Sequence, residues 1–138
     1  MLYRMKRNDN ENLHKEYPEL RQMTYNNKGY DYLVKNVLGF YVKIEHKKRG
    51  KNVKYDITPA QEKDADVFSL LTHDGIHYHI SKEDYLKLAR PHSALASGWT
   101  GKSKELSQKT FIENATTDLN EVVNKIKHNH ATLEGFIS

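Results

Sequence analysis

One run of residues, Val67–Leu71, constrains the fold of this chain more than any other segment. It reads VFSLL, and it has the length of a strand rather than of a helix. A strand with no alternation of apolar and polar residues is buried on both faces of its sheet. We therefore expect a central sheet with helices packed on it.

Four further segments have the composition of strands: residues 30–34, 40–46, 53–57 and 76–80. They are rich in aromatic and β-branched side chains, and turn-forming residues separate them. The basic turn at residues 47–52 predicts that the second of these strands folds back into the third, so the first three are expected to form an antiparallel meander.

Two helices are predicted from their N-terminal caps. Thr58 is followed by Pro59 at the first helical position and by Gln61 at the third, which is the pattern of a capping box. Ser81, with Asp84 three residues later, predicts the start of a second helix. The first of these helices lies between two predicted strands and the second follows the last predicted strand, so the chain mixes the two types of element.

The last helix is predicted from an amphipathic pattern that Thr117 precedes as its cap: Leu119, Val122, Val123 and Ile126. With 138 residues the chain has the size of one domain. The predicted fold class is α/β (α+β), with a mixed sheet of about five strands. We divide the single domain 1–138 into an N-terminal segment or helix (1–28), a sheet core (29–90) and a basic loop with the C-terminal helix (91–138).

Composition excludes several classes of protein. The sequence has no cysteine, so disulfides, thiolate metal sites and cysteine nucleophiles are excluded. No apolar run approaches the roughly 20 residues that cross a bilayer, and the first seven residues lack the apolar stretch of a signal peptide. We expect a cytoplasmic protein with no membrane partner, and any metal ion must be held by oxygen or imidazole.

Three residues carry the clearest chemistry: Asp31, Glu45 and Lys47. Glu45 and Lys47 share one face of a predicted strand, and Asp31 lies beside Glu45 if the preceding strand pairs with it. Two carboxylates can hold Mg²⁺, which prefers oxygen ligands and acidifies a bound water. A neighbouring ammonium can stabilise the charge that grows on a phosphate. A pairing of Lys43 with Glu45 fits the strand equally well.

This arrangement resembles the PD-(D/E)XK, or restriction-endonuclease-like, nuclease superfamily over roughly residues 11–90. The resemblance implies an endonuclease that hydrolyses DNA with Mg²⁺ or Mn²⁺, with Asp31 and Glu45 as metal ligands and Lys47 as a catalytic residue. It also places Gln61 near the site and takes a further acid from the first helix. The candidates for that acid are Glu11, Glu16 and Glu19. Small nucleases of this fold often act as homodimers, so a homodimer is a further expectation.

Basic residues flank the predicted catalytic strand and can attract the phosphates of a nucleic acid. The candidates around this strand are Lys43, Lys48, Arg49, Lys51 and Lys54. A second group surrounds the lone tryptophan, which is able to stack on a base or to anchor its loop to the core: Trp99, Lys102 and Lys104. We expect residues 92–109 to form an irregular basic loop.

Two other functions remain open on the sequence. His77 and His79 share one face of a predicted strand, so they are candidates for the acid and base of a metal-independent ribonuclease. Their simplest interpretation is a polar pair on the solvent face. The chain is alternatively a non-catalytic module that binds nucleic acid or, as a phage or mobile-element protein, inhibits an enzyme that acts on it.

Overall fold

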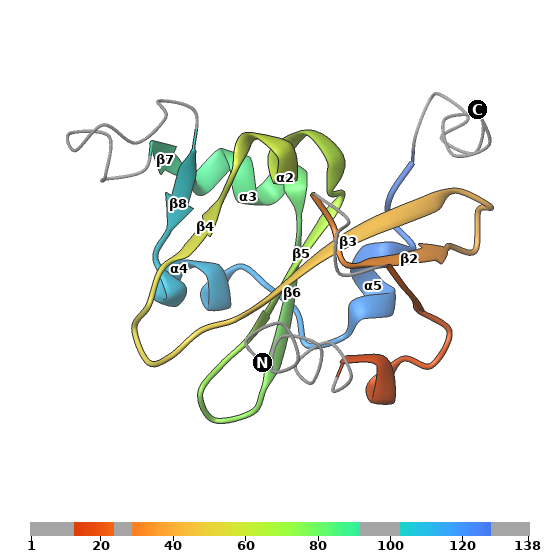
Figure 1. The fold of residues 1–138 in the computed structure, drawn as a ribbon, viewed down its shortest axis with the longest axis horizontal. Helices are drawn as coiled ribbons and strands as arrows, with labels where there is room; N and C mark the ends of the chain where they lie inside the picture. The colour runs from red at the N-terminus through yellow and green to blue at the C-terminus, as the bar shows by residue number, and fades with distance from the viewer. Residues whose placement is uncertain (1–12, 24–28, 92–102, 128–138) are drawn as a thin grey trace.

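A five-stranded mixed sheet forms the centre of the fold (Figure 1). The computed structural model describes residues 13–23, 29–91 and 103–127. The strands of this sheet lie in the order β1-β2-β3-β5-β6, and their bounds are Arg21–Gln22, Tyr32–Lys35, Tyr41–Lys48, Val67–Leu71 and His77–Ser81. Among the pairings of this sheet within the described residues, that of β3 with β5 is parallel and the other three are antiparallel, so the predicted mixed sheet is confirmed.

Strand β5 is buried along its whole length, as its sequence predicts. One face of the sheet packs against a core that includes Phe68, Leu70 and Tyr85. The other face packs against a second core that includes Ile44 and Val67. The helical turn at residues 13–16 and helix α5 (Leu119–Val123) contribute apolar side chains to this second core. The sheet therefore has two covered faces, and each carries a different set of buried polar groups.

The predicted three-stranded meander is wrong at its third strand. Strand β4 (Tyr55–Ile57) does not pair with β3 but joins a small second sheet in the order β4-β8-β7. The reason is that β2 pairs with one edge of β3 and β5 with the other, which leaves no edge for β4. The chain instead leaves the central sheet after β3, and β4 packs Tyr55 and Ile57 into the first core.

The small sheet also corrects the prediction of an irregular loop over residues 92–109. Strand β8 (Lys104–Leu106) pairs with β4 and with β7 (Arg90–Pro91), and helix α4 (Gln108–Glu113) begins directly after it at the cap Ser107. The sequence of β8 is polar because its central residue, Glu105, is a buried carboxylate that forms ion pairs with Lys54 and Arg90. Trp99 and Lys102 lie outside the described residues.

The helix caps are confirmed in two of three cases. Helix α2 (Pro59–Asp64) has both hydrogen bonds of the capping box between Thr58 and Gln61. Helix α3 (Lys82–Leu88) begins at Ser81, whose side chain accepts from the Asp84 amide. Helix α5 is capped by Asp118 rather than by Thr117. Within the described residues, no helix is long and apolar enough to cross a membrane.

Candidate active site

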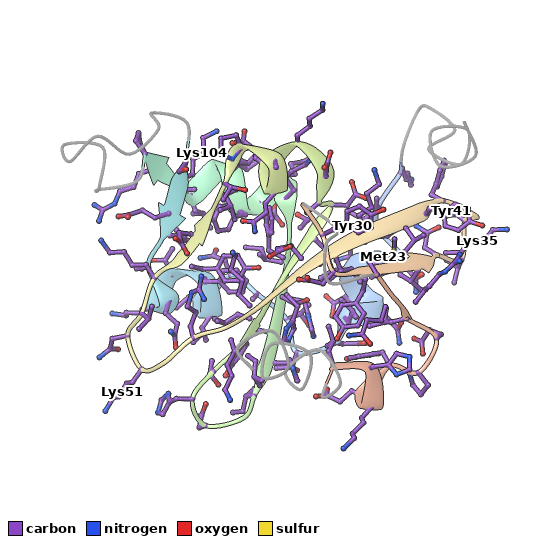
Figure 2. All side chains as sticks on the ribbon, in the orientation of Figure 1. Met23, Tyr30, Lys35, Tyr41, Lys51 and Lys104 are labelled. Carbon is purple, nitrogen blue, oxygen red and sulfur yellow. The ribbon has the colours of Figure 1, made fainter. Side chains whose placement is uncertain are left out.

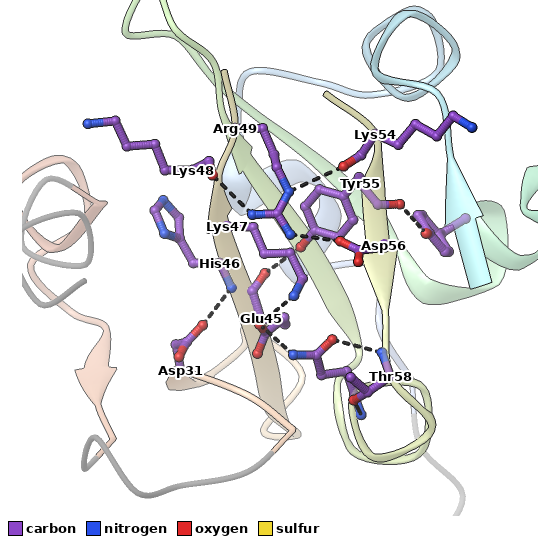
Figure 3. A network of polar contacts seen from close by, with 12 residues as sticks. Asp31, Glu45, His46, Lys47, Lys48, Arg49, Lys54, Tyr55, Asp56 and Thr58 are labelled. Atoms are coloured by element: carbon purple, nitrogen blue, oxygen red, sulfur yellow. Dashed lines mark hydrogen bonds and ion pairs between the residues drawn. The ribbon is translucent and has the colours of Figure 1, made fainter. Parts of the chain in front are cut away.

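Strand β3 presents Glu45 and Lys47 on one face of the central sheet and His46 on the other (Figure 3). Glu45 is only 4% exposed, and a buried carboxylate is costly unless charges and hydrogen bonds compensate it. The Lys47 ammonium lies 3.6 Å from Glu45 Oε2 and supplies the charge. Lys43 lies on the same face, but its ammonium sits 5.4 Å from the centroid of the Tyr30 ring. The ammonium beside Glu45 is thus that of Lys47.

Asp31 immediately precedes β2, whose first residue, Tyr32, pairs with Ile44 of β3. The Asp31 amide donates to the Ile44 carbonyl at 2.7 Å. The Asp31 carboxylate accepts from the His46 amide at 2.8 Å, and this bond fixes it at the edge of β3 (Figure 3). The structure therefore brings Asp31, Glu45 and Lys47 together.

Burial lowers the pKa of the Lys47 amine from its ordinary value, while the neighbouring carboxylates of Glu45, Asp56 and Asp31 act in the opposite direction. The side chain is 14% exposed. A lysine that has lost most of its hydration but keeps acidic neighbours presents a poorly screened positive charge to whatever approaches Glu45.

Gln61 has two functions in the same side chain. Its Oε1 accepts from the Thr58 amide at 3.0 Å and completes the cap of α2, and its Nε2 donates to Glu45 Oε2 at 3.1 Å. The capping box thus sets the position of a side chain that binds the buried carboxylate. Gln61 lies beside the pair of acids, where the sequence resemblance places it.

Three residues around this site were not predicted to take part in it. The Tyr55 hydroxyl donates to the Glu45 carbonyl at 3.1 Å, and the Tyr85 hydroxyl donates to the Tyr55 carbonyl at 2.7 Å. Burial raises the pKa of Tyr55 well above its ordinary value, so this hydroxyl stays a donor. Asp56 follows Tyr55 on β4 and accepts from Arg49 at 2.7 Å. A strand that joins a second sheet gives no local sequence signal for these contacts.

Arg49 ties the end of β3 to the start of β4. Its guanidinium donates to the carbonyls of Lys48 and Lys54 and to the Asp56 carboxylate. Burial by itself would raise the pKa of Asp56, but the hydrogen bond from Arg49, with the charges of Lys47 and Arg49, outweighs it and lowers this pKa. Arg49 therefore holds the connection that carries the exposed residues Lys51 and Asn52.

The other predicted nucleic-acid contacts differ in their surroundings. Lys48 and Lys51 are exposed, and Lys51 projects from the β3–β4 connection (Figure 2). Lys54 forms an ion pair with Glu105 at 2.9 Å, and Lys104 forms one with Glu62 at 2.8 Å. Alternation along β3 places Lys48 on the same face as His46, opposite Glu45. Lys54 and Lys104 also serve the packing of the small sheet.

The side chains around Glu45 offer few ligands to a divalent metal ion. Over residues 13–23, 29–91 and 103–127, no group of three or more histidine or acidic side chains is placed to hold a metal ion. Mg²⁺ is usually held by one or two carboxylates, several waters and the phosphates of a substrate. The carboxylates of Asp31 and Glu45, which both act on the charge of Lys47, fit that mode of binding.

His77 and His79 are buried, which corrects the prediction that they face solvent. They are 5% and 0% exposed, because α5 and the segment at residues 13–17 cover this face of the sheet. Burial, together with the charge of His77, lowers the pKa of His79 to about 3. The Nε2 atoms of both rings are enclosed in protein, so a substrate has no access to them.

Glu16, one of the acids considered for the metal, lies on this opposite face. Its carboxylate contacts His77 Nδ1 at 2.5 Å, and the His77 ring packs against that of His46. Glu19 is exposed, and Glu11 lies outside the described residues. Glu16 is therefore engaged with the histidines, on the far side of the sheet from Glu45.

No protein-family model matches the chain, and no curated protein matches it. Among solved structures, the chain is similar to Hjc, a Holliday junction resolvase from the archaeal hyperthermophile Archaeoglobus fulgidus. The TM-score is 0.56 at 13% sequence identity, and the match covers 88% of this chain and 97% of that chain. The similarity shows a mixed α+β fold of the restriction-endonuclease-like class, and the predicted fold class is confirmed.

Proposed function

We propose that this protein is a divalent-metal-dependent endonuclease that hydrolyses phosphodiester bonds in DNA. The observation that carries the proposal is the grouping of Asp31, Glu45, Lys47 and Gln61, with Lys47 Nζ 3.6 Å and Gln61 Nε2 3.1 Å from Glu45 Oε2. A fold shared with a resolvase, whose substrate is a DNA junction, supports DNA as the substrate.

Each residue has a part that follows from its surroundings. Asp31 and Glu45 would hold Mg²⁺ or Mn²⁺, and the bound ion supplies an acidified water and neutralises charge on a phosphate. Lys47 holds its positive charge beside Glu45 and stabilises the negative charge that develops on the phosphate oxygens. Gln61 keeps the Glu45 carboxylate in one orientation by a bond that the α2 cap fixes. Exposed Lys51, on the β3–β4 connection, attracts the DNA backbone.

The geometry favours this function over a metal-independent ribonuclease. A catalytic histidine must reach the proton that it transfers, and the buried imidazoles of His77 and His79 lie on the opposite face from Glu45. A non-catalytic DNA-binding module shares the fold and the exposed lysines with the proposed enzyme. A substitution at the site that abolishes cleavage but leaves DNA binding intact identifies the enzyme, because a non-catalytic module has no cleavage to lose.

The test incubates the protein with supercoiled plasmid and with single-stranded DNA in Mg²⁺, in Mn²⁺ and in EDTA. We expect cleavage in either metal, none in EDTA, and a loss of about 10²–10³-fold in rate for Lys47→Ala. Lys87→Ala is the matched control, because Lys87 is an exposed lysine on α3 that pairs with Glu83 and Asp84 of its own helix. Equal cleavage by both variants, or cleavage in EDTA, would refute the proposal. Binding without cleavage would support the non-catalytic module.

A further inference from the structure

The connection between β2 and β3 exposes two aliphatic side chains at its tip. Val37 is 78% exposed and Leu38 is 52% exposed, and the hairpin projects from one end of the central sheet (Figure 1). Aliphatic side chains that stay in water forgo the stabilisation that burial would give. A pair of them at the end of a projecting hairpin is therefore a candidate contact site.

The tip is rigid, because its backbone is tied both to itself and to the end of α5. Asn36 Oδ1 accepts from the amides of Leu38 and Phe40 at 3.1 and 3.0 Å. Asn36 Nδ2 donates to the carbonyls of Val123 and Ile126, and the Val37 amide donates to Asn124 Oδ1. These bonds hold Val37 and Leu38 in one exposed position, so they are presented at little further cost in conformational entropy.

The hairpin face that bears the candidate active site is basic and aromatic as far as the tip. Lys35 pairs with Tyr41 and Leu33 with Lys43 across β2 and β3, so these side chains lie on the same face as Glu45. The Lys35 ammonium lies 6.0 Å from the Tyr41 ring centroid (Figure 2). Lys125 and Lys127 are exposed in the segment that anchors the tip. The surroundings of Val37 and Leu38 thus favour a polyanionic partner.

The length of β3 between the hairpin tip and Glu45 sets the distance from the tip to the candidate active site. Phe40, which closes the tip, precedes Glu45 by five residues, and a strand rises about 3.4 Å per residue, which gives about 17 Å. One strand of DNA advances 3.4 Å per nucleotide. A DNA strand that follows the hairpin would therefore pass about five nucleotides between the two places.

We propose that the β2–β3 hairpin is a DNA-binding arm whose Lys35 and Lys43 contact phosphates and whose Val37 and Leu38 insert at an unstacked base step about five nucleotides from the cleaved bond. This inference rests on the proposed function. Aliphatic wedges between base steps are an established mode of DNA binding, and they favour steps where stacking is already weak. The preferred substrate is then a duplex with an unpaired nucleotide rather than a continuous one.

The test uses short duplexes with one unpaired nucleotide at varied positions, beside a fully paired duplex. We expect the wild-type protein to cut about five nucleotides from the unpaired nucleotide, with the cut moving as that nucleotide is moved. The double variant Val37→Ser/Leu38→Ser should lose at least tenfold of the preference over paired duplex. Ile76→Ser is the matched control, because Ile76 is 40% exposed in another turn. Cuts that ignore the unpaired nucleotide, or an unchanged preference in the double variant, would overturn the inference while leaving the nuclease intact.

A binding measurement separates failure of the arm from failure of the nuclease. In the Lys47→Ala background, 2-aminopurine beside the unpaired nucleotide should brighten when protein binds, and the double variant should abolish the increase. An unchanged signal would refute insertion whether or not the wild-type protein cuts DNA. Sedimentation and anionic vesicles test the other occupants of the tip. A dimer or vesicle contact that depends on Val37 and Leu38, without an effect on DNA, would overturn the proposal.

Discussion

Acid should destabilise this protein through its buried histidines, and His79 sets the scale of the effect. Its pKa is lowered from 6.5 to about 3, chiefly by burial. Below pH 6.5 the unfolded chain therefore binds a proton at this residue that the folded protein does not bind. The free energy of unfolding decreases as the pH is lowered from about 6.5 to about 3. The arithmetic gives a loss of about 2 kcal/mol at pH 5 and about 5 kcal/mol in total, at 1.36 kcal/mol per pH unit. Burial also lowers the pKa of His46, so His46 adds to the loss.

The assay is urea denaturation at pH 7.5, 6 and 5, with the free energy of unfolding compared across the series. We expect the wild-type protein to lose about 2 kcal/mol or more between pH 7.5 and pH 5. His79→Gln keeps a partner for the Ser69 hydroxyl, which lies 2.6 Å from His79 Nδ1, but it does not titrate in this range. Its loss over the same interval should be smaller by about 2 kcal/mol. Identical pH dependence in the two proteins would refute the reasoning.

Three further substitutions test the contacts around the site. Gln61→Ala removes half of the α2 capping box and a partner of Glu45, so it should cost about 1 kcal/mol in urea denaturation and slow cleavage; an effect on stability alone would contradict the second function. Arg49→Ala removes the donor to three acceptors at the β3–β4 connection and should cost about 1–3 kcal/mol, and Arg49→Lys should not restore the lost stability. Gly29→Ala places a Cβ 2.6 Å from Asp64 Oδ2 at a φ of +92°, so thermal unfolding should show a larger loss than for Gly75→Ala. Gly75 has a φ of +84° but nothing within 4 Å, and equal losses would show that the close contact relaxes.

The parts of the fold that depend on local sequence could be predicted. The apolar run of β5 and the capping box at Thr58 were identified because burial on two faces and cap geometry both leave local patterns. The place of β4 could not be predicted, because it depends on β5 occupying the edge of β3 beside which β4 was expected. The alternation of His77 and His79 was correct. Their burial could not be predicted, because the face that carries them is covered by α5 and residues 13–17, which are distant in sequence.

The candidate site shows the same division. Glu45 and Lys47 are two residues apart on one strand, so alternation alone places them on one face. Asp31 and Gln61 come from other parts of the chain. The expected pairing of two strands pointed to Asp31, and only the family resemblance pointed to Gln61. Tyr55 and Asp56 reach the site from the second sheet, and no spacing in the sequence indicates that approach.

Metal binding by Asp31 and Glu45 is the central claim, and Mn²⁺ titration followed by electron paramagnetic resonance tests it most directly. The measurement is made in the Lys47→Ala background with a short duplex DNA, so that the DNA stays intact while it supplies phosphate ligands. We predict that Asp31→Asn and Glu45→Gln each weaken Mn²⁺ binding at least tenfold, whereas Glu16→Gln, on the opposite face, leaves it unchanged. Equal Mn²⁺ affinity in all of these proteins would contradict the account.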